Sequence, residues 1–153
     1  MHSIGGNWGD GMAIYDAIKL CRSHVTILVY GQAESMSSVI LQAADSRIMM
    51  PNAYFMCHYG SSGSAGNYLD TQNWAKFEAK ILESMIDIYK EKCKKGKYFQ
   101  EKYQTINDDK VVKFLSRKMK DGDWYLSSHE AVYYGFADSV ITHRKYGSIT
   151  SLK

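Results

Sequence analysis

Three kinds of side chain that could cooperate in nucleophilic catalysis stand at the ends of expected secondary-structure elements. Ser35 follows a β-prone run at 25–30 and precedes an apolar, helix-like run, while His58 ends the strand-like stretch "YFMCH". A serine hydroxyl is a poor nucleophile unless a base lies within hydrogen-bond reach. A carboxylate then holds the base in the useful tautomer, and either Asp121 or Asp123 could supply it.

A turn near the start of the chain could stabilise the negative charge that such a reaction creates. Residues 3–6, "SIGG", precede a helix-like run, and their glycines allow backbone N–H groups to point into a cleft. The tetrahedral intermediate of acyl transfer needs backbone donors of this kind. Free N–H groups also gather at a helix start, such as the one after Ser35. The sequence therefore contains a candidate for each part of a serine hydrolase.

Each of these residues also has an ordinary structural interpretation. Serine is a favoured helix N-cap, so Ser35 could simply cap the helix that follows it. A single histidine at a strand end is usually structural, and Asp121 and Asp123 flank Gly122 as turn residues would. The two glycines of "SIGG" could form an ordinary tight turn. The residues taken one by one leave these alternatives open.

The elements that would position these residues alternate along the chain. Apolar spacing predicts helices at about 9–23, 35–44, 68–95 and 108–119, and strands at 25–30, 47–50, 53–58 and 138–142. The glycine- and serine-rich segment 59–67 is expected to be flexible or extended. Ser127 and Glu130 form a capping-box pattern, and Gly135 ends the short helix that it starts. This order predicts an α/β fold with a mostly parallel sheet.

Composition limits the classes of protein to which the chain could belong. Its 153 residues are 45% hydrophobic and 23% charged, as in a globular domain, and a net charge of +3 is too small to indicate nucleic-acid binding. Three cysteines without a C-x-x-C pair favour free thiols in a reducing compartment over disulfides or a zinc site. No apolar run is long enough for a signal peptide or membrane span. We expect a cytoplasmic protein with no metal, no cofactor and no membrane partner.

Four stretches of the sequence resemble the ClpP peptidase family. They are "GMAIYDAI", "GQAESM", "MPNAYFMCH" and "YLSSHEAVYYGFADSVITHR". They occur in the family's order, and the resemblance extends from Ser3 to about Arg144. It implies a ClpP/crotonase-like fold with a mostly parallel sheet and a long projecting handle helix. It also implies a serine endopeptidase that cleaves peptides or unfolded proteins inside an oligomeric chamber.

The resemblance implies a catalytic role for each matched position. Ser35 matches the nucleophile, His58 the general base and Asp123 the residue that orients the base. Asp123 is preferred over Asp121 because it lies four residues before Ser127, which is the family's spacing.

The resemblance further implies how a substrate would be held. The backbone N–H groups of Gly6 and Met36 match the oxyanion hole, and the glycine-rich segment matches a strand that pairs with the substrate backbone. The implied substrate-binding residues are Gly5, Tyr59, Gly60, Ser61, Ser62 and Gly63.

Some positions depart from the family pattern. Ile4 replaces the proline of S-P-G-G, Tyr59 and Gly60 replace Gln-Pro, and Glu34 would add negative charge beside the nucleophile. These departures favour a divergent branch, such as the ClpP-like proteases that phages use in capsid maturation, which would act in the host cytoplasm. Family members also have several dozen residues before this turn. We therefore expect one domain over residues 1–153 without the family's N-terminal axial segment, either because the sequence is a fragment of a longer protein or because this branch has lost the segment.

The expected long helix also predicts assembly. An apolar stripe runs along it, formed by Trp74, Phe77, Ile81, Met85 and Ile88. Exposed patches of this kind usually mark a partner surface. In the ClpP family this helix joins two heptameric rings, so we expect a homo-oligomer of that type. The resemblance also implies an unfoldase ATPase as a candidate partner, and the chain has no G-x-x-x-x-G-K-[ST] motif of its own.

Two other functions compete with the peptidase. A catalytically inactive ring or scaffold subunit could share the fold, although it would have no need of an intact Ser35, His58 and Asp123 set. An acyl-CoA enzyme of the crotonase fold would use acidic residues at its reacting centre, and Glu34 is the only feature that favours it.

Overall fold

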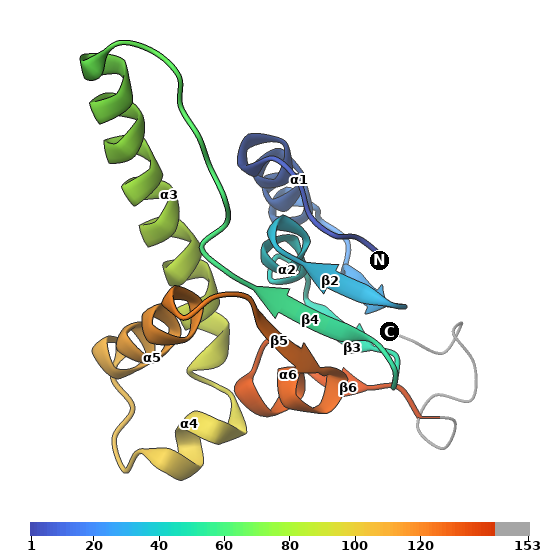
Figure 1. The fold of residues 1–153 in the computed structure, drawn as a ribbon. Coiled ribbons are helices and arrows are strands. Elements are labelled where there is room, and N and C mark those ends of the chain that lie inside the picture. The colour runs from blue at the N-terminus through green and yellow to red at the C-terminus, as the bar shows by residue number, and fades with distance from the viewer. Residues whose placement is uncertain (143–153) are drawn as a thin grey trace.

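Two three-stranded sheets frame the part of the chain, residues 1–142, that the computed structural model describes (Figure 1). In one sheet β1 (Thr26–Val29), β3 (Ser46–Met49) and β6 (Ser139–Val140) run parallel in the order β1-β3-β6. In the other, β2 (Gln32–Glu34) is parallel to β4 (Tyr54–Cys57), and β5 (Trp124–Ser127) is antiparallel to β4. The prediction of an α/β fold with mostly parallel strands is confirmed.

The strand predicted at 25–30 is shorter than expected. It ends at Val29, and the chain then passes through Tyr30 and Gly31 into β2, a strand that the sequence does not predict. Ser3 forms a bridge alongside β2: its N–H donates to the carbonyl of Gln32 and its carbonyl accepts from the N–H of Glu34. This pairing brings the "SIGG" turn beside the corner at Ser35.

The helices agree with the predicted ones in place but differ in extent. They are α1 (Trp8–Leu20), α2 (Met36–Leu41), α3 (Tyr68–Cys93), α4 (Lys97–Lys102), α5 (Asp108–Lys120) and α6 (Ser128–Tyr134). Helix α2 is shorter than predicted because the chain tightens after Leu41 into i→i+3 hydrogen bonds. Helix α4 is an addition, since its six residues are too few for a clear apolar period.

Polar side chains define several helix starts. Asn7, Asn67 and Asn107 accept hydrogen bonds from the first free N–H groups of α1, α3 and α5. The predicted capping box of Ser127 and Glu130 is present at the start of α6.

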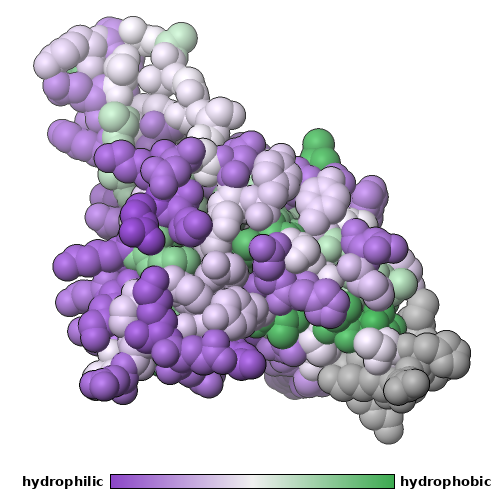
Figure 2. Space-filling view, turned by 60° about the horizontal axis from the view of Figure 1, so that its bottom comes forward, coloured by the Kyte–Doolittle hydropathy of each residue, from purple (hydrophilic) through white to green (hydrophobic). Residues whose placement is uncertain are grey.

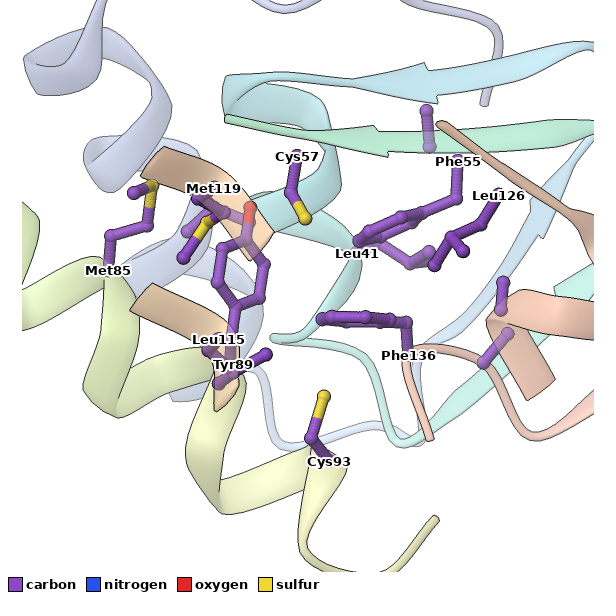
Figure 3. Packing of buried hydrophobic residues seen from close by; sticks show 14 of the residues in the cluster. Leu41, Phe55, Cys57, Met85, Tyr89, Cys93, Leu115, Met119, Leu126 and Phe136 are labelled. Atoms are coloured by element: carbon purple, nitrogen blue, oxygen red, sulfur yellow. The ribbon is translucent and has the colours of Figure 1, made fainter. Parts of the chain in front are cut away.

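Aromatic rings hold the core between α3, β4 and the end of α6 (Figure 3). The rings of Phe55 and Phe136 stack with centroids 4.5 Å apart, and Tyr89 of α3 meets Phe136 edge-on at 5.4 Å. All three side chains are fully buried. Burying a side chain of this size stabilises the folded state by about 1.5–3 kcal/mol.

Helix α3 is partly core and partly a projecting arm. Its 26 residues span about 39 Å at 1.5 Å per residue. Its C-terminal half buries Met85, Ile86 and Tyr89, whereas its N-terminal half extends away from the sheets (Figure 1). Trp74 and Phe77 on that half remain 40% and 50% exposed. The arm also projects from the rest of the molecule in Figure 2. The predicted projection of the helix is therefore confirmed.

A buried arginine connects the ends of three elements. Arg47 of β3 is 7% exposed, forms an ion pair with Asp138 and donates to Gln42 and to the carbonyl of Gly135. It therefore joins the turn after α2, the end of α6 and the approach to β6. An arginine is stable in such a place because its charge is paired with Asp138 and each of its three side-chain nitrogens has a partner.

The three cysteines are free thiols, as predicted: Cys21 is exposed, and Cys57 and Cys93 are buried. Burial raises the pKa of both buried thiols. None of the helices within residues 1–142 has the length and apolar character needed to span a membrane.

Candidate active site

Ser35 occupies a sharp corner between β2 and α2. Its backbone has φ 50° and ψ −124°, and it is the only non-glycine residue with positive φ among residues 1–142. Its N–H donates to the carbonyl of Met56 at 2.9 Å. Ser35 occupies the N-cap position of α2, as the cap interpretation expects, but its hydroxyl makes no capping hydrogen bond to the helix. A conformation of this kind costs about 1–3 kcal/mol and is held by the surrounding structure.

The Ser35 hydroxyl is instead hydrogen-bonded to a histidine that contacts a carboxylate. His58 Nε2 lies 2.9 Å from Ser35 Oγ, and His58 Nδ1 lies 2.8 Å from Asp123 Oδ1. Antiparallel pairing of Cys57 with Trp124 explains the second contact, because it sets the next residues, His58 and Asp123, opposite each other.

The neighbouring aspartate lies elsewhere. Asp121 is the C-cap of α5. The carboxylate that contacts the imidazole is that of Asp123.

Two serines that the sequence analysis did not single out support this corner. Ser37 Oγ lies 2.6 Å from the carbonyl oxygen of Glu34 and 2.9 Å from that of Ser3. Ser38 Oγ lies 2.5 Å from the carbonyl oxygen of Ser35 and 2.6 Å from the Tyr89 hydroxyl. Both serines are buried. The run of hydroxyl residues in "SMSS" was the signal available in the sequence.

The "SIGG" turn packs against the same corner. Gly5 has φ +96°, and a Cβ there would lie 2.7 Å from Ser35 Cβ and 2.8 Å from the Met36 nitrogen. Only glycine permits this approach. Gly6 and Met36 line one cleft with Ser35, and Met36 begins α2, so its N–H has no partner within the helix. These two groups could bind an oxyanion that forms on a carbonyl attacked by Ser35.

A cleft of about 700 Å³ opens beside Ser35 and His58. Segment 59–62 lines it, while Gly5 and Gly63, which were also predicted to bind substrate, are not among its lining residues. The facing wall is α3, which contributes Trp74, Phe77, Glu78, Ile81, Leu82 and Met85. The Tyr59 hydroxyl donates to the carbonyl of Ser116, 3.1 Å away, and so fixes the segment to α5.

Comparison with known proteins agrees with this arrangement. Residues 1–144 match the model of the family described as Clp protease. The chain belongs to the Clp protease family. It is 33% identical over 139 residues to the "ATP-dependent Clp protease proteolytic subunit" of Deinococcus radiodurans, an alignment that covers 90% of this chain. The chain spans 60% of that relative's length. The predicted ClpP-like family is confirmed.

Two positions that depart from the sequence pattern of the Clp protease family, Gly60 and Glu34, can be located in the structure. Gly60 has φ +82°, which the proline usual at this position could not adopt. Glu34 does not line the cleft. It lies two residues along β2 from Gln32, the partner of Tyr54, and raises the pKa of the Tyr54 hydroxyl, chiefly through a hydrogen bond. The Glu34 carboxylate therefore interacts with Tyr54 and is not among the groups that line the cleft.

Proposed function

We propose that this chain is a serine endopeptidase in which Ser35 is the nucleophile, His58 the general base and Asp123 the residue that orients the base. The observation that carries the proposal is the continuous contact from Ser35 Oγ through both imidazole nitrogens to Asp123. With Nδ1 protonated and donating to the carboxylate, Nε2 is free to accept the Ser35 proton. The same nitrogen would later return the proton to the leaving amine.

The backbone N–H groups of Gly6 and Met36 form the proposed oxyanion hole. Both residues line the cleft at Ser35, and the Met36 N–H stands at the positive end of α2. Donors held in place before the reaction stabilise the developing charge without reorganisation, and removing one such donor typically costs about 10²–10³ in kcat. A side chain at position 5 would clash with Ser35 and with the Met36 nitrogen, so glycine there allows the turn to lie close to these donors.

Segment 59–62 is the proposed binding edge for the substrate backbone. It begins directly after His58, lines the cleft and is not paired with another strand within the described residues. An extended peptide could add to it by backbone hydrogen bonds. Peptides and unfolded proteins are the substrates that can present such an extended backbone.

Labelling with a fluorophosphonate, followed by mass spectrometry of the modified residue, tests the assignment. We expect covalent modification of Ser35 and loss of both labelling and peptide cleavage in Ser35→Ala, because loss of a triad member costs several orders of magnitude in rate. Ser84→Ala is the matched control, since Ser84 is exposed on α3 and does not line the cleft. Labelling that persisted in Ser35→Ala would exclude the proposed nucleophile.

We infer further that the chain assembles through α3 into a homo-oligomer, with face-to-face heptameric rings as the family arrangement. The supporting observation is that Tyr68 and Leu69, at the projecting end of the helix and outside the cleft, stay 74% and 65% exposed. Large exposed apolar side chains close together favour a protein partner. An unfoldase ATPase is a proposed partner of the assembly, in keeping with the ATP-dependent relative. Light scattering at micromolar concentration tests the assembly, and a strictly monomeric protein would exclude it.

The alternatives from the sequence receive less support. An inactive subunit of the same fold would not require the hydrogen-bonded Ser35, His58 and Asp123 arrangement. A crotonase-type acyl-CoA enzyme would need an acid in the cleft beside Ser35, and Glu34, the residue that favoured it, does not line that cleft.

A further inference from the structure

One carboxylate lies in the wall of the cleft. Glu78 of α3 is half-buried there, and its neighbours along that wall are the apolar Trp74, Phe77 and Ile81. No other acidic residue and no lysine or arginine lines the cleft. Among residues 1–142 no ion pair to Glu78 is formed. A charge placed in a binding cleft without a protein partner attracts a ligand of opposite sign.

Two aromatic rings stand beside this carboxylate. Trp74 and Phe77 have ring centroids 5.8 Å apart at 50°, and both side chains are substantially exposed. Lysine and arginine bury their alkyl stems on such surfaces, and their charged ends interact with aromatic faces. The combination of rings and a carboxylate therefore fits a cationic side chain better than a neutral or acidic one.

Helix geometry places Glu78 outward from the part of α3 that enters the core. It precedes the buried Met85 by seven residues, or about 10 Å along the helix axis. An extended peptide advances about 3.3 Å per residue and turns every second side chain to the same wall. A peptide in the cleft would thus present to Glu78 a side chain two to four residues from the one beside Met85.

We propose that Glu78, Trp74 and Phe77 form an outer subsite that binds a lysine or arginine side chain of the substrate, two to four residues from the side chain that lies beside Met85 in the inner part of the cleft. This inference rests on the proposed peptidase function. It gives the cleft two levels: an apolar inner level at Val39, Leu82 and Met85, and an outer level at which charge selects the substrate.

Fluorogenic peptides that differ at single positions provide the test. Each has the same leucine at the scissile bond, and either lysine or glutamate two, three or four residues away on each side. The wild-type protein should show kcat/KM about five- to tenfold higher for the best lysine peptide than for its glutamate counterpart, as one charge-assisted contact provides. Glu78→Gln should bring this ratio close to one, and Glu78→Lys should invert it.

A matched control separates the subsite from the overall charge. Glu83→Gln removes the same charge from an exposed position of α3 that does not line the cleft, and its ratio should equal that of the wild type. Circular dichroism and thermal unfolding of the variants confirm that they are folded. A wild-type ratio near one, or a ratio that Glu78→Gln leaves unchanged, would overturn the subsite and leave the peptidase function standing.

A binding measurement tests the subsite independently of the proposed peptidase function. Fluorescence anisotropy of labelled lysine and glutamate peptides is measured with Ser35→Ala and with Ser35→Ala carrying Glu78→Gln. Preference for the lysine peptide that depends on Glu78 supports the subsite, even if the wild-type protein cleaves nothing and the peptidase proposal fails. Equal binding of both peptides by Ser35→Ala overturns the subsite.

Discussion

The hydroxyl of Ser38 lies between the carbonyl oxygen of Ser35 and the hydroxyl of Tyr89, at 2.5 Å and 2.6 Å. Since Ser38 donates to Ser35, Tyr89 donates to Ser38. The contact connects the strained corner that carries the proposed nucleophile to the part of α3 that lies in the core. Tyr89 is fully buried, and burial raises the pKa of its hydroxyl well above its usual value.

Ser38→Ala should destabilise the protein by about 1–3 kcal/mol, because it leaves the Tyr89 hydroxyl buried without an acceptor. Chemical denaturation measures the change. The double variant Ser38→Ala with Tyr89→Phe removes both polar groups and should recover much of the loss. Additive effects of the two substitutions would contradict the contact.

If Asp123 orients the imidazole as proposed, Asp123→Asn should lower kcat by about 10⁴ at neutral pH, since an amide favours the wrong imidazole tautomer, as in the established Ser-His-Asp proteases. Steady-state kinetics with a peptide substrate measures the loss. Asp121→Asn is the matched control: it makes the same change two residues away, at the C-cap of α5, and should retain activity. Equal losses in the two variants would remove Asp123 from its proposed role.

Gly60→Pro should raise KM for peptides and leave the melting temperature nearly unchanged. Gly60 has φ +82°, which proline cannot adopt, so segment 59–62 must rearrange. The space around Gly60 is open, and the core is expected to remain folded. Peptide kinetics combined with thermal unfolding tests this, and an unchanged KM would show that the segment takes no part in binding.

The capping box predicts a pH-dependent contribution to stability. The hydroxyl and N–H of Ser127 donate to Glu130 and hold the pKa of its carboxyl below the ordinary value of 4.5. A lowered folded-state pKa stabilises the native state above the unfolded pKa, and this stabilisation is lost as the pH falls through the folded pKa.

Glu130→Gln should therefore be less stable than the wild type at pH 7, by about 0.5–1 kcal/mol for a partly exposed cap. The difference should disappear below the folded-state pKa. Thermal unfolding from pH 7 to pH 3 measures it, and a difference that stayed constant over this range would argue against the ionised cap.

Local sequence patterns predicted much of the secondary structure of this protein. The period of apolar residues predicts α3 almost to its ends, and the spacing of Ser127, Glu130 and Gly135 predicts α6 with its cap. The resemblance to the ClpP family indicated that Ser35, His58 and Asp123 meet at the corner, whereas the residues alone left the choice between Asp121 and Asp123 open. Such features are readable because helix periodicity, capping and turn chemistry depend on residues only a few positions apart.

The tertiary structure alone decided the contacts between distant segments. The positive φ of Ser35 depends on the pairing of β2 with β4 and on the Ser37 and Ser38 hydrogen bonds, none of which a short stretch of sequence specifies. The contact of His58 with Asp123 joins residues 65 positions apart and exists because β5 pairs antiparallel with β4. In the sequence Glu78 is one of several charged residues on a helix, and only the fold shows that it lines the cleft. Strand register and the direction of a helix face are set by packing across the whole chain, which local sequence cannot specify.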